Sequence, residues 1–131
     1  MLPYTILIID DTADHRDVLG RLLRSVGYQV VEAATGEEAL RAARAVRPDL
    51  ILTAVSLPGQ PAWNTTRRLH AEPDLATTPI LGATLYNTLL PWSWIRTLGC
   101  VDLVNKPFDL DDLLRRIALL LPSAPPALLM A

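Results

Sequence analysis

The sequence has 131 residues, which suffices for one domain with a single sizeable core. Its formal net charge is −2, which argues against a nucleic-acid-binding protein, and its one cysteine, Cys100, excludes an intramolecular disulfide and reads as a packed thiol. The N-terminus has no basic signal-peptide segment and every apolar run is too short to span a bilayer, so we expect a cytoplasmic protein without membrane partners.

Apolar runs of strand length alternate along the chain with stretches of helical apolar spacing. In chain order we expect a strand at 5–9, a helix at 14–26, a strand at 28–31, a helix at 36–46, a strand at 50–55, a helix at 62–70, a strand at 80–84, a helix at 91–98, a strand at 101–104 and a helix at 109–121. Gly27 and Gly99 stand where helices should stop. Thr35 with Glu38 forms a capping box, and Asp109 is expected to cap the last helix.

The alternation predicts an α/β fold in which a parallel sheet carries helices on both faces, because right-handed crossovers lay each helix against the sheet. We expect one domain over residues 1–121, followed by a Pro-rich C-terminal tail over residues 122–131. Ligands of such sheets bind in the crevice at the carboxyl ends of the strands. The residues that should gather there are Asp10, Asp11, Ala54, Thr84 and Lys106.

Over residues 4–121 the sequence resembles the receiver domain of two-component response regulators. The resemblance is carried by the acidic pair in ILIIDD, by PDLIL with LPG downstream, by PILGAT, and by NKPF after LGCVDLV, in this order and at receiver-like separations. It implies a single doubly wound (βα)5 flavodoxin-like fold with a five-stranded parallel sheet.

The resemblance also implies a chemistry, in which an aspartate at the end of the third strand accepts a phosphoryl group. On this sequence, Asp10 and Asp11 correspond to the magnesium-binding pair, Thr84 to the switch hydroxyl and Lys106 to the lysine that neutralises phosphoryl charge. Ala54 occupies the nucleophile position, and a methyl group cannot form an acyl phosphate. We therefore expect no catalytic residue, no required cofactor, and magnesium binding at Asp10 and Asp11 that is weak or absent.

No neighbouring side chain is expected to replace the missing nucleophile. Thr53 should point to the opposite face of the sheet, Ser56 lies beyond the strand end, and Asp49 lies at its entry end. Pro61-Ala62 and Leu103 also depart from the receiver pattern, so we interpret the chain as a natural pseudo-receiver whose Ala54 is one of several changes.

The retained polar residues also admit purely structural roles. Asp10 and Asp11 could end a strand and cap the first helix, and Lys106, the only lysine in the chain, could form a buried ion pair that fixes a loop. We expect His15 and His70 to be solvated helix residues, because neither has neighbours typical of a metal ligand.

A partner surface is predicted on the face made in receivers by the fourth helix, fifth strand and fifth helix. It should include Leu89, Leu90, Trp94 and Leu103, because exposed aromatic and aliphatic patches mark protein-binding sites. A packed position for Trp94 against the neighbouring loop is the alternative.

We expect a stand-alone, non-enzymatic pseudo-receiver that acts in signal transduction through a protein partner or self-association, without phosphorylation. One alternative is a flavodoxin-like small-molecule or nucleotide binder or enzyme, although no Gly-rich phosphate loop follows the first strand. Another is a receiver domain excised from a larger regulator, with residues 122–131 as the start of a linker.

Overall fold

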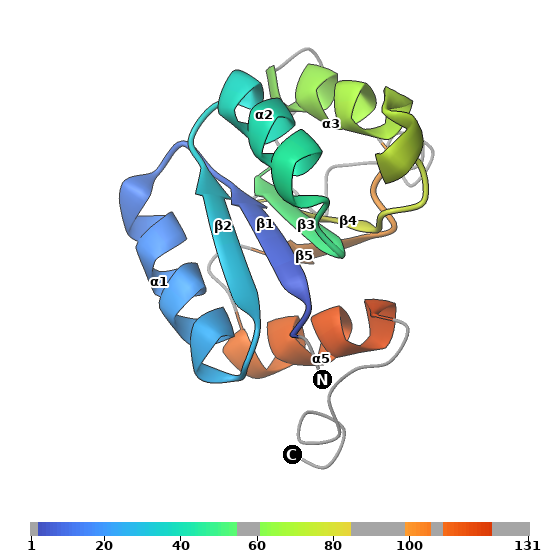
Figure 1. Ribbon diagram of the computed structural model, residues 1–131. Coiled ribbons are helices and arrows are strands. Elements are labelled where there is room, and N and C mark those ends of the chain that lie inside the picture. Colours follow the sequence, from blue (N-terminus) through green and yellow to red (C-terminus); the bar gives the residue numbers. More distant parts are fainter. Residues whose placement is uncertain (1–2, 55–60, 85–98, 106–108, 122–131) are drawn as a thin grey trace.

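The computed structural model describes residues 3–54, 61–84, 99–105 and 109–121, and within them strands alternate with helices (Figure 1). The elements are β1 (Thr5–Ile9), α1 (Ala13–Ser25), β2 (Gln29–Ala33), α2 (Gly36–Val46), β3 (Leu50–Ala54), α3 (Pro61–Ala71), the 3-10 turn η1 (Pro73–Leu75), β4 (Ile80–Thr84), β5 (Asp102–Asn105) and α5 (Leu110–Leu120).

The strands form one five-stranded sheet in the order β2-β1-β3-β4-β5, and every neighbouring pair is parallel. Helices α1 and α5 lie on one face of this sheet, and α2 and α3 lie on the other (Figure 1). The predicted α/β fold, a parallel sheet covered on both faces, is confirmed.

Two apolar clusters fill the spaces between the sheet and its helices, because successive strand residues point to opposite faces. One cluster joins β1 and β3 to α2 and α3 through residues that include Leu7, Ile51, Leu40 and Leu69. The other joins the same strands to α1 and α5 through residues that include Ile6, Leu52, Leu23 and Ile117. The central strands are therefore buried on both faces, as their continuous apolar runs predict.

Local end signals fix several helix boundaries where the sequence predicted them. Gly27, just after α1, has a φ of 102°, which a residue with a Cβ rarely adopts. Gly99 has a φ of 90°, but the helix that it was predicted to end lies outside the described residues. Thr35 Oγ1 accepts the Glu38 N–H at 3.2 Å, and Asp109 accepts the Asp112 N–H at 3.1 Å. These caps satisfy first-turn donors of α2 and α5 that lack a partner within the helix.

Other details differ from the expectation. The second strand begins and ends later than predicted, at Gln29–Ala33, and η1 was not anticipated. The helix expected at 91–98 lies outside the described residues, as does residue 55 at the end of the third strand. Within the described ranges, no helix is both long enough and apolar enough to cross a membrane.

Candidate functional site

The sheet brings three of the predicted residues to its carboxyl edge. Ile9 pairs with Thr53 across β1 and β3, so Asp10, which follows β1, lies beside Ala54, the last residue of β3. Ala54 in turn pairs with Ala83, the residue before Thr84, which ends β4. The candidate site is therefore the end of three adjacent parallel strands, where the fold class predicts a crevice.

Asp10 is a buried carboxylate, with 4 % of its surface exposed. Its Oδ1 accepts the Thr12 N–H at 2.9 Å, and its backbone N–H donates to the Ala33 carbonyl at 3.1 Å. The backbone carbonyl of Asp10 accepts a hydrogen bond from Arg16 Nη1 at 2.7 Å. These bonds hold both the backbone and the carboxylate plane of Asp10 in place.

Among the described residues, His15 places an imidazole nitrogen beside this carboxylate. Its Nδ1 lies 3.3 Å from Asp10 Oδ2, while 46 % of the His15 side chain remains exposed. The first turn of α1 carries the imidazole back over the strand end, since helical side chains lean toward the N-terminus. His15 lies on α1 and is exposed, as the sequence predicted, but its contact with Asp10 was not predicted.

Among the described residues, Arg16 forms its ion pair with Glu32. Its Nε lies 3.6 Å from Glu32 Oε1 on β2, and Glu32 Oε2 also lies 3.3 Å from Arg24 Nη2. Arg16 and Arg24, two of the three arginines of α1, thus share one carboxylate of the edge strand. Arg16 thus contacts both Glu32 and the Asp10 carbonyl, whereas the carboxylate of Asp10 faces His15.

The remaining described residues of the edge differ sharply in exposure. Asp11 is exposed, and its Oδ1 accepts the Thr12 hydroxyl at 3.4 Å. Thr84 is buried, with 1 % of its surface exposed. Thr53 is equally buried; its hydroxyl lies 3.3 Å from the Ala54 carbonyl, and strand alternation puts it on the face of Ile51, toward α2 and α3.

Several predicted site residues fall outside the described ranges, namely Leu89, Leu90, Trp94 and Lys106. Leu103 is described, and its place in the predicted partner surface was wrong. Only 4 % of its surface is exposed, because β5 turns it into the cluster that contains Cys100 and Ile80. A residue packed there offers no area for a partner in this conformation.

The described residues do not fit the magnesium ion that receiver domains are expected to hold. Magnesium demands oxygen ligands in octahedral geometry. The side chain of Ala54 has no oxygen, Asp10 Oδ2 faces an imidazole, and of the acidic pair only Asp11 has an exposed carboxylate. Across the described ranges, no group of three or more His, Cys, Asp or Glu side chains could hold a metal.

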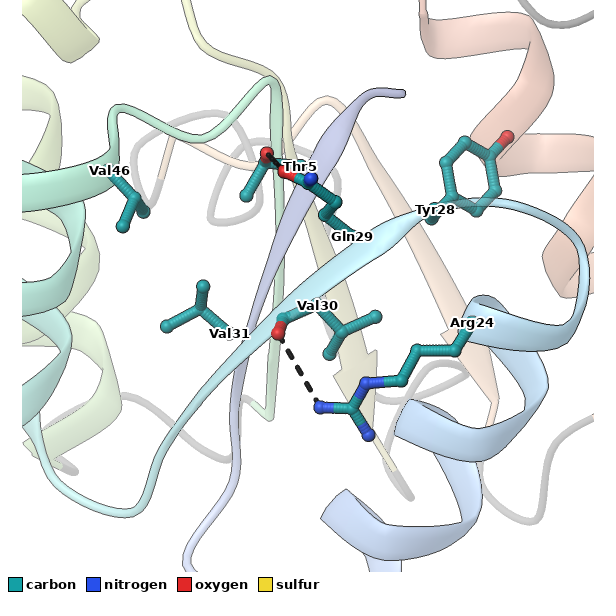
Figure 2. A pocket seen from close by; sticks show the side chains of 7 residues that line it. All are labelled: Thr5, Arg24, Tyr28, Gln29, Val30, Val31 and Val46. Carbon is teal, nitrogen blue, oxygen red and sulfur yellow. Dashed lines mark hydrogen bonds between the residues drawn. The ribbon is translucent and has the colours of Figure 1, made fainter. Parts of the chain in front are cut away.

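A separate hollow lies at the β2 edge of the sheet. It has a volume of about 540 Å³ and is lined by Thr5, Arg24, Tyr28, Gln29, Val30, Val31 and Val46. Figure 2 shows Arg24 reaching from α1 to the carbonyl of Val30, with Val46 of α2 on the far side of the strand. Because Thr5 and Gln29 begin their strands, this hollow lies at the opposite end of the sheet from Asp10 and is not part of the candidate site.

Comparison with known proteins places this architecture in a family. The family model for the response regulator receiver domain matches residues 6–118. Protein PilH of Pseudomonas aeruginosa is 30 % identical over 112 residues, which are 86 % of this chain and 93 % of PilH. The CAI-1 autoinducer sensor kinase/phosphatase CqsS of Vibrio cholerae is 32 % identical over 114 residues, 86 % of this chain but only 17 % of CqsS.

A solved structure agrees with the sequence relatives. The chemotaxis protein CheY4 of Vibrio cholerae superposes with a TM-score of 0.82 at 27 % identity, over 91 % of this chain and 99 % of CheY4. Receiver domains are in general signalling modules. The chain therefore belongs to the response regulator receiver domain family, whose members act in two-component signal transduction.

Proposed function

We propose that this chain is a pseudo-receiver, a receiver domain that signals through protein contacts without aspartyl phosphorylation. The observation that carries the proposal is Ala54, which ends β3 directly beside Asp10, where the receiver resemblance requires the phosphoacceptor carboxylate. A methyl group has no lone pair to attack phosphorus. The rest of the fold is retained, so we infer that the chain still binds a partner although it has lost the phosphorylation chemistry.

Two described side chains near β3 are poor substitutes for the missing nucleophile. The hydroxyl of Thr53 is buried and lies against the Ala54 carbonyl on the wrong face of the sheet. Asp49 precedes β3, and its Oδ2 accepts the Thr5 N–H at 2.8 Å at the opposite end of the sheet. Asp10 and Asp11 follow β1 and not β3, so neither stands at the position of the missing nucleophile.

The partner that we propose is a protein of a two-component pathway or a second copy of this chain. Leu89, Leu90 and Trp94 remain the proposed contact residues, and Leu103 is withdrawn because it is buried. A partner can select one conformation of the domain only through a difference in affinity between conformations. Regulation would therefore depend on which partner is present, and neither nucleic acid nor a membrane is required.

Incubation with acetyl phosphate and magnesium, followed by intact mass measurement, tests the loss of phosphorylation. We expect no added phosphoryl group on the wild-type chain, under conditions in which a receiver that retains its aspartate is modified. A stoichiometric adduct that is labile in alkali, as acyl phosphates are, would contradict the proposal. Mapping that adduct would show which carboxylate had taken the place of Ala54.

Solution mass tests the contact surface separately. If the chain self-associates through the proposed residues, Trp94→Ala should reduce the mass to that of a monomer. The matched control is Leu119→Ala, a large apolar residue on α5 that is 75 % exposed. Loss of assembly with the Leu119 variant and not with the Trp94 variant would place the contact on the outer face of α5 instead.

A further inference from the structure

We infer that the Arg24 side chain covers the free edge of strand β2 and so prevents that edge from pairing with a second copy of this chain. The inference goes beyond the proposed function, because it depends neither on phosphorylation nor on the proposed contact residues. It rests on three observations: the position of β2 in the sheet, the contacts of Arg24 with that strand, and the space that Gly20 leaves for them.

Strand β2 presents unpaired backbone groups on its outer side. It is the first strand in the order β2-β1-β3-β4-β5, so within the described sheet it has a neighbouring strand on one side only. The Gln29 N–H and the Ala33 carbonyl form hydrogen bonds with the residues that flank β1. Because the backbone groups of successive residues point to alternate sides of a strand, those of Val30 and Glu32 point away from β1. Such an edge is a template for a further strand.

A second copy of this chain is the partner that fits the β2 edge. When two such edges pair antiparallel about a twofold axis, the outward N–H groups of each strand meet the outward carbonyls of the other, so the edge is complementary to itself. Apolar side chains flank the edge, because the hollow of about 540 Å³ is lined in part by Val30, Val31 and Val46 (Figure 2). An edge with apolar flanks is prone to association unless it is protected.

Arg24 lies across this edge. Its Nη2 donates to the Val30 carbonyl at 3.5 Å (Figure 2), and the same atom lies 3.3 Å from Glu32 Oε2. Arg16 holds the other oxygen of Glu32, with 3.6 Å between Arg16 Nε and Glu32 Oε1. The guanidinium of Arg24 thus occupies one outward acceptor of β2 and is paired with the next outward residue. A second copy has to displace this charged group, and charged side chains commonly protect edge strands in this way.

Gly20 leaves the space that the Arg24 side chain occupies. It is buried in the middle of α1, where glycine is a poorer helix former than alanine. A Cβ at this position would lie 2.9 Å from Arg24 Nη1 and 3.3 Å from Glu32 Oε2. Gly20→Ala should therefore displace the guanidinium while it leaves every charge of the chain in place.

Light scattering on the full chain, from micromolar to millimolar concentration, tests the inference. Arg24→Ala should gain mass relative to the wild type, up to about twofold, because each chain has one β2 edge and a twofold pair is closed. The matched control is Arg21→Ala, which removes the same charge from the same helix. Arg21 is exposed and pairs with Asp17 at 3.1 Å, so its loss should leave the mass at the wild-type value.

Two further variants separate edge pairing from unfolding. Gly20→Ala should gain mass without losing stability to urea, because alanine is the better helix former. Adding Val30→Pro to Arg24→Ala should restore the wild-type mass, because proline removes an outward N–H and is tolerated on an edge strand.

Three results would overturn the inference: a wild-type mass for Arg24→Ala, an equal gain of mass in Arg21→Ala, or a gain that Val30→Pro does not reverse. All of these variants retain Trp94, so the outcome is separate from that of the Trp94→Ala experiment.

Discussion

Asp10 is buried, and the ionised form of a buried carboxyl group is costly in free energy. Burying a carboxylate is unfavourable unless hydrogen bonds or an opposite charge compensate for lost hydration. At Asp10 the Thr12 N–H and the His15 imidazole provide that compensation within the described structure. The methyl group of Ala54 adds no second negative charge beside it, so the alanine relieves a repulsion that receivers offset with a metal ion.

We therefore expect Ala54→Asp to destabilise the metal-free protein. A second carboxylate beside Asp10 should lower the free energy of unfolding by about 1–3 kcal/mol at pH 7, within the usual range for introducing an unfavourable charge. Millimolar magnesium should restore part of the loss, because the new carboxylate completes an oxygen site. Urea unfolding with EDTA and with magnesium measures both effects.

Ala54→Asn is the matched control for that change, because the amide has the size of the carboxylate without its charge. It should lose less stability than Ala54→Asp and should not respond to magnesium. Equal losses in the two variants, with no effect of magnesium, would mean that steric crowding and not charge makes Ala54 favourable here.

Cys100 gives a prediction about alkaline pH. Burial raises the pKa of its thiol from 9.0 to about 12 in the folded chain. Because the unfolded chain ionises first, the stabilisation is complete below pH 9 and is lost as pH rises toward 12. The stability of the wild type should begin to fall just above pH 9, and Cys100→Ala should not show that first decline.

Two measurements check the role of the thiol. Urea unfolding of both proteins between pH 8 and pH 10 gives the slope of stability with pH, on the acid side of the Tyr28 transition, whose pKa burial raises from 10.0 to about 12. A thiol reagent should label Cys100 only after denaturant is added. Rapid labelling of the native chain would show that the thiol is accessible, contrary to its burial.

Side-chain positions at the strand ends could be predicted only in part from the sequence. Asp10, Ala54 and Thr84 follow from strand lengths, because the carboxyl ends of parallel strands share an edge. The contact of His15 could not be predicted, because helical spacing says which face a residue occupies and not which atom it meets. The prediction that Leu103 belongs to the partner surface was wrong for a related reason: a short strand pattern does not say which of its two faces is buried.

The ends of helices were predicted from the sequence better than the ends of strands, because capping is a local interaction. Thr35 and Glu38 cap α2 reciprocally in outline, although Glu38 Oε2 accepts from the Ala34 N–H at 2.7 Å, one residue earlier than a standard capping box. Strand ends depend on which neighbour supplies a hydrogen bond. The predicted end of β2 was therefore too early, because this strand continues beside β1 to Ala33.

Arg116 links helix α5 to strand β5, which leads to a prediction about how these two elements are held together. Arg116 donates from Nη1 to Asp102 on β5, from Nε to Asp112 within α5 at 2.8 Å, and also contacts the Leu103 carbonyl at 3.4 Å. These contacts raise the pKa of Arg116, first through the hydrogen bond to Asp112. The Arg116 side chain thus links α5 to β5.

Arg116→Ala should lower the free energy of unfolding by about 1 kcal/mol, the usual net worth of a hydrogen bond, because partial exposure weakens the ionic part. Arg115→Ala is the matched control: Arg115 contacts the same Asp112 carboxylate at 2.6 Å but is exposed and does not reach β5. Its loss should leave stability unchanged within error. Equal effects on urea unfolding would show that the pairing with Asp112, and not the link to β5, is what stabilises α5.

At the scale of the whole molecule, the parallel sheet follows from the alternating pattern, but the order of its strands does not. Continuous apolar runs indicate that strands such as β1 and β3 are buried on both faces, and right-handed crossovers limit the topology. The direction in which each crossover moves along the sheet depends on tertiary packing. The order β2-β1-β3-β4-β5, and with it the hollow beside the β2 edge, therefore required the structure.

The two clusters on opposite faces should behave as independent cores, since the sheet separates them. Ile80 belongs to the cluster under α2 and α3, and Ile117 to the cluster under α1 and α5. Ile80→Val and Ile117→Val should each cost about 0.5–1.5 kcal/mol in urea unfolding, and the double variant should lose their sum, as distant sites do. Ile51→Val with Ile80→Val is the matched pair, because these residues are register partners on one face and should depart from additivity. The opposite outcome would be additive losses of stability for Ile51→Val with Ile80→Val and non-additive losses for Ile80→Val with Ile117→Val. It would mean that strain passes through the strands more readily than between neighbours on one face.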